Sequence, residues 1–150
     1  MEIREARRED VVSLLELYTQ LHDHALHNTM PALGTALEEL WDSILNDKNH
    51  HVILGIVDGT VVCSCVIVVI LNLTRGQRPY ALIENVITDE RHRNKGYASA
   101  ILNFAWDIAK QENCYKIMLM TGSKSESTLR FYEKAGYNQQ DKTAFIQWLE

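Results

Sequence analysis

The stretch from Ile83 to Asn103 constrains the fold of this 150-residue chain more than any other. Its first part, residues 83–88, is short, mostly apolar and rich in β-branched side chains, which predicts a buried strand. Its last part repeats apolar residues at helical spacing, which predicts one broad buried face. That face comprises Ile101, Leu102, Ala105, Trp106, Ile108 and Ala109. Because a polar turn around Gly96 separates the two parts, we expect a strand, a turn and a helix in succession.

The turn between strand and helix is a candidate anion-binding site. A strand that leads through a turn into a helix presents unpaired backbone N–H groups and the positive end of the helix dipole. The chain has a formal net charge of -5, yet Arg91, Arg93 and Lys95 all lie within this one turn. Local positive charge in an acidic protein favours a negatively charged ligand at this point.

The composition is that of a globular protein, with 46% hydrophobic and 23% charged residues. The length suits a single domain over residues 1–150, and the net negative charge argues against nucleic acid as a partner. No apolar run approaches the ~20 residues that cross a bilayer, and the N-terminal residues lack a signal-peptide pattern. The odd number of cysteines, three, fits reduced structural thiols. We therefore expect a cytoplasmic protein with no membrane partner.

Periodicity and turn signals along the chain predict a mixed α+β fold without an internal linker. Asp10 and Thr35 are candidate N-caps of the first two helices, and Asp58-Gly59 is a strong signal for a two-residue hairpin. Residues 22–31 are expected to end the first helix and form a loop. The expected strands lie at 3–6, 51–57, 60–71, 80–88, 116–120, 137–142 and 143–149. The expected helices lie at 11–21, 35–45, 99–109 and 125–134.

Two motifs resemble the hallmarks of the GCN5-related N-acetyltransferase (GNAT) superfamily. Residues Arg93 to Ala98 match its Arg/Gln-x-x-Gly-x-Gly/Ala signature, and they follow a strand of the right character. Residues Leu129 to Tyr137 resemble its second hallmark, a helix that ends in Phe/Leu-Tyr-x-x-x-Gly-Phe/Tyr. The order of elements is also similar over nearly the whole chain. The resemblance implies the GNAT fold, a central, mostly antiparallel twisted sheet flanked by helices.

The resemblance also implies that the chain binds acetyl-CoA as a co-substrate. In the family the pyrophosphate lies on backbone amides of the glycine turn, and the pantetheine arm pairs with the preceding strand like an additional strand. Gly96 would let the phosphate approach the backbone, and unpaired strand edges accept extended ligands. Ser125 lies near the position where the family often has an asparagine that contacts the pantetheine arm. The expected cofactor-binding residues are Val86, Ile87, Thr88, Arg93, Asn94, Lys95, Gly96, Tyr97, Ala98, Ser99 and Ser125.

Acetyl transfer to an amine requires a neutral amine, stabilisation of the thioester oxygen and protonation of the leaving thiolate. Tyr132, through its place in the second motif, is the candidate general acid; the alternative is a core tyrosine that closes the last helix. Glu84 is the candidate base, because a carboxylate in an apolar strand is costly unless it has a partner. The alternative for Glu84 is a salt bridge to Arg75 or Arg78, or an outward-facing side chain.

The acceptor site is expected from the first two helices, which in the family cover the acceptor pocket. His22, His24, Tyr18 and Met30 are candidate substrate contacts, and the alternative for the histidines is a solvated helix end. His22 and His24 diverge on a helix, and no cysteine or carboxylate cluster completes a zinc set, so we expect no metal. Two loop arginines either recognise a phosphate or carboxylate on the acceptor or are simply solvated. They are Arg75 and Arg78.

The leading hypothesis is an N-acetyltransferase that acts on a primary amine of a small molecule. A protein or peptide N-acetyltransferase and a non-catalytic acyl-CoA sensor remain as alternatives, and dimers are common in the superfamily, so a homodimer is one expected state. A Rossmann dehydrogenase is excluded because the three-glycine fingerprint is absent. A P-loop enzyme is excluded because the chain has no Gly-Lys-Ser/Thr sequence.

Overall fold

The computed structural model describes residues 1–21 and 32–149. These residues form two compact units, Met1–Leu119 and Met120–Glu150. The first unit contains the sheet and most helices, and the second contains the last helix and the C-terminal segment. The expectation of a single domain over residues 1–150 stays a prediction.

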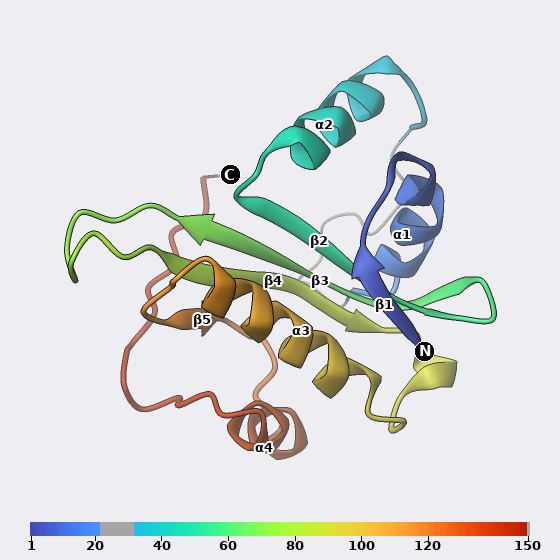
Figure 1. The fold of residues 1–150 in the computed structure, drawn as a ribbon. Coiled ribbons are helices and arrows are strands. Elements are labelled where there is room, and N and C mark those ends of the chain that lie inside the picture. The colour runs from blue at the N-terminus through green and yellow to red at the C-terminus, as the bar shows by residue number, and fades with distance from the viewer. Residues whose placement is uncertain (22–31, 150) are drawn as a thin grey trace. The chain divides into compact units, whose positions relative to one another are not determined.

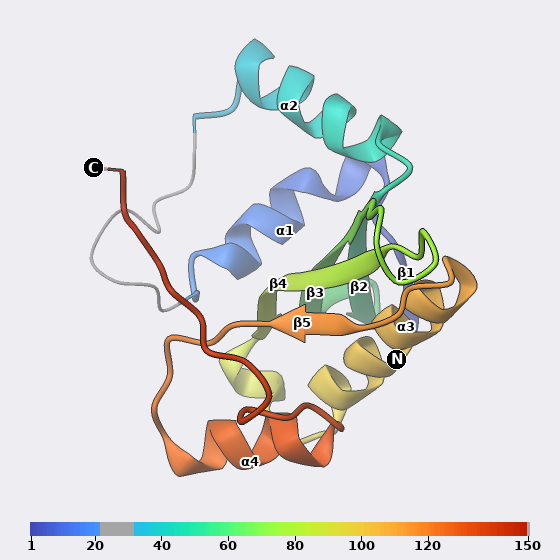
Figure 2. The same cartoon turned by 90° about the vertical axis from the view of Figure 1, so that its left-hand side faces the viewer.

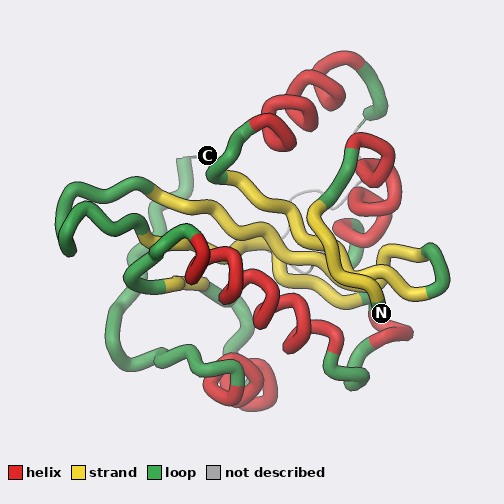
Figure 3. Tube along the Cα trace, in the orientation of Figure 1, coloured by secondary structure: helices red, strands yellow, loops and turns green. Residues whose placement is uncertain are grey.

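The first unit is built on a five-stranded sheet with the order β1-β2-β3-β4-β5. The first four strands pair antiparallel, and β5 pairs parallel with β4. Its strands are β1 (Glu2–Glu5), β2 (His50–Val57), β3 (Thr60–Ile70), β4 (Tyr80–Thr88) and β5 (Ile117–Leu119). The predicted α+β class with a mostly antiparallel sheet is confirmed. The predicted hairpin is also present, since Val57 pairs with Thr60 and both Asp58 and Gly59 have positive φ (Figure 3).

Helices cover both faces of this sheet (Figures 1 and 2). Helix α3 (Tyr97–Gln111) packs on one face, against β2, β3 and β4. Helices α1 (Val11–Tyr18) and α2 (Thr35–Asn46) lie on the opposite face. Two short 3-10 turns, η1 (Arg8–Asp10) and η2 (Glu90–His92), precede α1 and α3. The central residues of β2 and β3 are buried because helices cover these strands from two sides.

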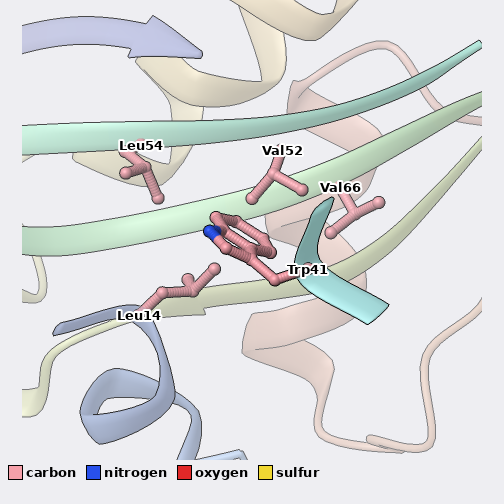
Figure 4. Packing of buried hydrophobic residues seen from close by; sticks show 5 residues of the cluster. All are labelled: Leu14, Trp41, Val52, Leu54 and Val66. Atoms are coloured by element: carbon pink, nitrogen blue, oxygen red, sulfur yellow. The ribbon is translucent and has the colours of Figure 1, made fainter. Parts of the chain in front are cut away.

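The core on the α1 and α2 face gathers around Trp41 (Figure 4). Strand alternation places Val52 and Leu54 of β2 and Val66 of β3 on this face, and Leu14 of α1 packs against them. The indole Nε1–H of Trp41 donates to the carbonyl oxygen of Arg8 at 3.1 Å. A buried tryptophan with its N–H paired contributes a large apolar surface at no polar cost.

Three expectations in this unit are wrong in detail. Thr35 does not cap α2, because it is the first residue of the helix and Gly34 is the N-cap. Asp10 does not cap α1 through its side chain; its carboxylate instead accepts from Arg4 Nη1 at 2.6 Å and from the Arg7 amide at 2.7 Å. Trp106 does not share the buried face of α3, since it is 52% exposed and has Lys110 Nζ at 4.9 Å from its ring centre. The side chains of Asp10 and Trp106 thus interact with residues that periodicity alone does not reveal.

The second unit centres on helix α4 (Glu126–Lys134). Ser125 caps it by accepting a hydrogen bond from the Thr128 amide, and Gly136 beyond its end has φ of 93°. The strands predicted at 137–142 and 143–149 are wrong, because the described residues 137–149 contain no strand. The large apolar side chains near the end of this segment are exposed, so they fill no buried face that would favour a strand. Among them are Phe145, Ile146, Trp148 and Leu149.

Within the described part of the chain, no helix has both the length and the apolar character needed to cross a membrane.

Candidate functional site

Strand β4 carries a bulge at its centre. Glu84 lies opposite Val66 and Ile87 lies opposite Ser64, so two residues of β4 face the single residue Cys65 of β3. The first of the two, Asn85, has φ of 51°, a left-handed conformation that asparagine tolerates better than most residues. A bulge disrupts the ladder locally and bends the strand. It therefore changes the direction of β4 at Glu84, immediately before the cofactor residues predicted from the sequence.

Strand β4 also loses its neighbour on the other side at this point. Its parallel pairing with β5 ends at the pair Ile83 and Leu119. In the first unit, the segment from Glu84 to Thr88 therefore has no paired strand on its β5 side. Unpaired strand edges present N–H and C=O groups to which an extended ligand can bind.

The turn after β4 opens toward solvent at the start of α3. Gly96 precedes the helix with φ of 78°, and a Cβ added there would meet no atom within 4 Å. The Ala100 amide donates the first hydrogen bond of the helix to the carbonyl oxygen of Gly96, at 3.0 Å. Helix geometry thus leaves the amides of Tyr97, Ala98 and Ser99 without an intrahelical acceptor. These amides and the helix dipole form the anion cradle that the sequence predicts.

Asp89 holds the turn in place although sequence reasoning missed it. Its carboxylate is 6% exposed and accepts from the Arg91 amide at 3.0 Å, from Gln20 Nε2 at 3.0 Å and from His92 Nδ1 at 3.1 Å. Hydrogen bonds from the Arg91 side chain, then from Gln20, hold the pKa of Asp89 well below its usual range. Gln20 Oε1 also accepts from the Glu90 amide at 3.1 Å. The end of α1 is thereby tied to the turn.

The three basic residues of the turn have different roles. Arg91 forms an ion pair with Asp89 at 3.1 Å, so its charge is already balanced. Arg93 donates from Nε to the carbonyl oxygen of Thr88 at 3.3 Å. Across residues 1–21 and 32–149, neither Arg93 nor Lys95 forms an ion pair. The positive charge that remains for a ligand comes from these two side chains.

A cavity of about 300 Å³ lies between α1, α2 and the strands β2 to β4. Fourteen of the described residues line it. Ten of these are aliphatic or tryptophan, and the other four are Tyr18, His50, Glu84 and Asn85. Glu84, a sequence-predicted catalytic residue, is half-buried and reaches this cavity from the bulge. Tyr18, predicted as a substrate contact, lines it from α1.

The hydroxyl of Tyr18 is neutral in this setting. Burial raises the pKa of Tyr18, and side-chain hydrogen bonding with Ser64 and Asn85 lowers it by a smaller amount. Ser64 Oγ is buried and has no hydrogen bond of standard geometry among the described residues, so its interaction with Tyr18 is a weak one. The two polar groups near the bulge are thus directed at Tyr18 from β3 and β4.

Several predicted residues lie elsewhere. Arg75 and Arg78 are exposed in the β3–β4 loop, at the other end of β4 from Gly96, and neither lines the cavity. Arg78 donates to the carbonyl oxygens of Asn113 and Cys114 at 3.1 and 3.0 Å, and the Arg75 guanidinium lies 5.8 Å from the Tyr115 ring centre. His22, His24 and Met30 lie outside the described residues. The roles of these five residues stay predictions.

Tyr132 and Ser125 belong to the second unit. Tyr132 is half-buried in an aromatic cluster, with edge contacts to Phe131 at 5.0 Å and to Tyr137 at 6.2 Å between ring centres. The Ser125 hydroxyl is engaged locally, since it caps α4 and lies 2.8 Å from Thr128 Oγ1. The roles predicted for them toward the cofactor are not tested by this arrangement.

Three residues of the site escaped sequence reasoning. Asn85 could have been found as an asparagine inside an apolar strand, a position where such a residue marks a bulge or turn. Asp89 and Gln20 are far apart in the chain, and no local pattern links them. In the described part of the chain, no group of three or more histidine, cysteine or acidic residues is placed to hold a metal ion.

A strand with a free edge, followed by an amide-lined glycine turn, is the arrangement expected from the resemblance. The sequence profile described as the Acetyltransferase (GNAT) family matches residues 11–137. The chain belongs to this GNAT family. Its fold is shared with a candidate acetyltransferase from Agrobacterium tumefaciens strain C58, at a TM-score of 0.87 and 30% identity over 99% of this chain and 100% of the other.

Two further relatives come from Trypanosoma brucei. The crystal structure of an acetyltransferase matches this GNAT chain with a TM-score of 0.81 and 25% identity, over 98% of this chain and 99% of the other. A glucosamine 6-phosphate N-acetyltransferase is 32% identical over 84 residues. That match covers 56% of this chain and 55% of the relative, so it spans little more than half of either protein.

Proposed function

We propose that the protein is an acetyl-CoA-dependent N-acetyltransferase that acts on a primary amine of a small molecule. The observation that carries the proposal is the free edge of β4 between Glu84 and Thr88, which leads directly into the glycine turn. Membership of the GNAT family supports acetyl transfer, and the partial match to a glucosamine 6-phosphate N-acetyltransferase supports a small amine acceptor.

The residues of the turn fit a pyrophosphate. The space beside Gly96 is open, and the amides of Tyr97, Ala98 and Ser99 have no intrahelical acceptor. We assign the pyrophosphate to these amides, with Arg93 and Lys95 as nearby cations. The residues Val86, Ile87 and Thr88 would pair with the pantetheine arm along the free edge. Roles for Asn94 and Ser125 in cofactor binding belong to the same proposal.

Bound acetyl-CoA supplies an acetyl thioester, whose C–S bond breaks as the new C–N bond forms. In the proposal, Glu84 accepts the proton that the ammonium group must lose before it attacks. The bulge at Asn85 releases backbone groups from the ladder, and an N–H there would stabilise the thioester oxygen. Tyr132 would hold the proton that the departing thiolate takes up.

The decisive experiment is a screen of primary amines with acetyl-CoA, with thiol release as the measurement. We expect release above the hydrolysis background with at least one amine, and mass spectrometry of the product should show one added acetyl group. A protein that binds acetyl-CoA in calorimetry but acetylates no amine or peptide would instead be a non-catalytic acyl-CoA sensor.

A further inference from the structure

The cavity beside Glu84 also indicates which kind of amine the acceptor is. We propose that the acceptor is a small primary amine on an apolar body, with no phosphate or other anionic group. This inference rests on the proposed acetyl transfer, because it assigns the cavity to the acceptor of that reaction. Its volume of about 300 Å³ is at the lower end of the range for small-molecule sites.

The walls of the cavity offer carbon surface rather than hydrogen bonds. Ten of the fourteen lining residues are aliphatic or tryptophan. The Trp41 indole N–H is already paired with the carbonyl oxygen of Arg8, so only its ring carbons remain for a ligand. A sugar acceptor would leave several hydroxyl groups without partners against these walls, and each unpaired buried polar group is costly.

The charge of the lining favours a cation and disfavours a phosphate. Among the lining residues that the structure describes, Glu84 is the one carboxylate and none is lysine or arginine. Arg8 lies outside this lining and pairs with Asp42 at 2.9 Å. A carboxylate attracts an ammonium group, whereas a phosphate placed here would lose its water close to a like charge.

Tyr18 and Asn85 supply the polar contacts close to Glu84. The raised pKa of Tyr18 keeps its hydroxyl neutral at physiological pH, so it adds no charge to the cavity. Both residues line the cavity at the same end as Glu84. Of the described lining residues, Tyr18, Glu84 and Asn85 thus form a polar end at the β4 bulge, where the amine would lie. Apart from His50, the other described lining residues are apolar and would surround the body of the acceptor.

The first experiment compares 2-phenylethylamine with glucosamine 6-phosphate as acceptors for the full chain with acetyl-CoA. We expect kcat/KM for 2-phenylethylamine to exceed that for glucosamine 6-phosphate by at least about tenfold, the discrimination that a pocket of fixed polarity readily provides. Equal or better use of glucosamine 6-phosphate would overturn the inference.

An arginine placed at the exposed edge of the cavity provides a second test, with an arginine elsewhere on the same helix as its control. Leu40 lines the cavity but is 58% exposed, so Leu40→Arg adds a cation without burying it. This variant should shift the ratio of the two kcat/KM values toward glucosamine 6-phosphate by about tenfold. Ser43→Arg adds the same charge to an exposed position of α2 outside the lining and should leave the ratio unchanged. Equal ratios in the two variants would contradict the assignment.

Binding measurements separate this inference from the proposed function. Calorimetry should show that 2-phenylethylamine binds and that Glu84→Gln weakens this binding about tenfold or more, with little effect on the uncharged 2-phenylethanol. Binding of the amine without any thiol release would refute acetyl transfer and support the apolar amine site. Transfer to glucosamine 6-phosphate but not to 2-phenylethylamine would refute the apolar site and support acetyl transfer.

Discussion

Gly96 combines a left-handed backbone with open space on its outer side. A side chain at φ of 78° is strained, and it would also occupy the space assigned to the pyrophosphate. Gly59 in the β2–β3 hairpin has a similar φ of 77° and open space as well, so it provides a control for the strain alone. The two positions therefore separate conformational cost from ligand contact.

We predict that Gly96→Val folds and binds acetyl-CoA at least about tenfold more weakly than wild type, because two or more amide contacts to the phosphates are lost. Both Gly96→Val and Gly59→Val should lose ~1–2 kcal/mol of folding stability, but Gly59→Val should bind acetyl-CoA with unchanged affinity. Calorimetry gives the affinities and urea unfolding gives the stabilities. Wild-type affinity in Gly96→Val would remove the glycine turn from the cofactor site.

A second prediction at this scale concerns the Tyr132 hydroxyl. Tyr132→Phe keeps the ring and its contacts to Phe131 and Tyr137, so it should fold and bind acetyl-CoA nearly as wild type does. Its turnover should fall by ~10²–10⁴, the range for a lost general acid. Tyr137→Phe removes a hydroxyl from the same cluster and should change turnover by less than about threefold. Full activity of Tyr132→Phe with a confirmed acceptor would return this residue to a packing role.

At the scale of elements, β4 and the η2 turn form one functional piece. The bulge at Asn85 redirects β4, its free edge continues to Thr88, and Asp89 then fixes the turn before Gly96. Because Gln20 donates to Asp89 and accepts from Glu90, α1 supports the turn from outside the strand. The geometry of the cradle therefore depends on a carboxylate that itself touches no expected ligand group.

The ionisation of Asp89 predicts a pH dependence. Since its folded-state pKa lies below its unfolded value of ~3.9, its contribution to stability is present above that value and is lost as the pH falls through the folded pKa. Asp89→Asn should therefore be less stable than wild type by about 1 kcal/mol at pH 7, a modest value because the Arg91 side chain is largely exposed to solvent.

Urea unfolding at pH 7 and at pH 3 measures this difference. The gap between wild type and Asp89→Asn should narrow at pH 3. Asp42→Asn, which removes the partner of the exposed Arg8, should differ from wild type by at most ~0.5 kcal/mol at either pH. A gap for Asp89→Asn that stays constant between the two pH values would show that the charge of Asp89 does not stabilise the turn.

At the scale of the whole molecule, cofactor binding should couple to global stability. A ligand that binds only the folded chain adds about 2.7 kcal/mol at one hundred times its Kd. For a chain of 150 residues this corresponds to a rise in Tm of about 5–10 °C. We predict this rise for wild type with acetyl-CoA at that concentration and at most about half of it for Gly96→Val, because a tenfold weaker affinity leaves about 1.4 kcal/mol at the same concentration. An identical rise in both proteins would place the ligand away from the glycine turn.

Local patterns in the sequence determined much of this architecture. Apolar, β-branched runs bounded by turns located β2 to β4, helical periodicity located α3, and Asp58-Gly59 located the hairpin. Each of these features depends on residues close together in the chain. The same reasoning located the glycine turn, since a glycine with positive φ at a helix start is a local requirement. It failed for residues 137–149, which form no strand and whose large apolar side chains are exposed.

Only the tertiary structure decided the features that make the site. The register that places the bulge opposite Cys65 follows from how β4 pairs with β3, and the free edge follows from where β5 ends, so neither is encoded in β4 alone. The tie between Gln20 and Asp89 joins residues 69 positions apart, and the cavity needs two helices and three strands to enclose it. Long-range contacts of this kind depend on the packing of whole elements, and a reading of neighbouring residues contains no information about them.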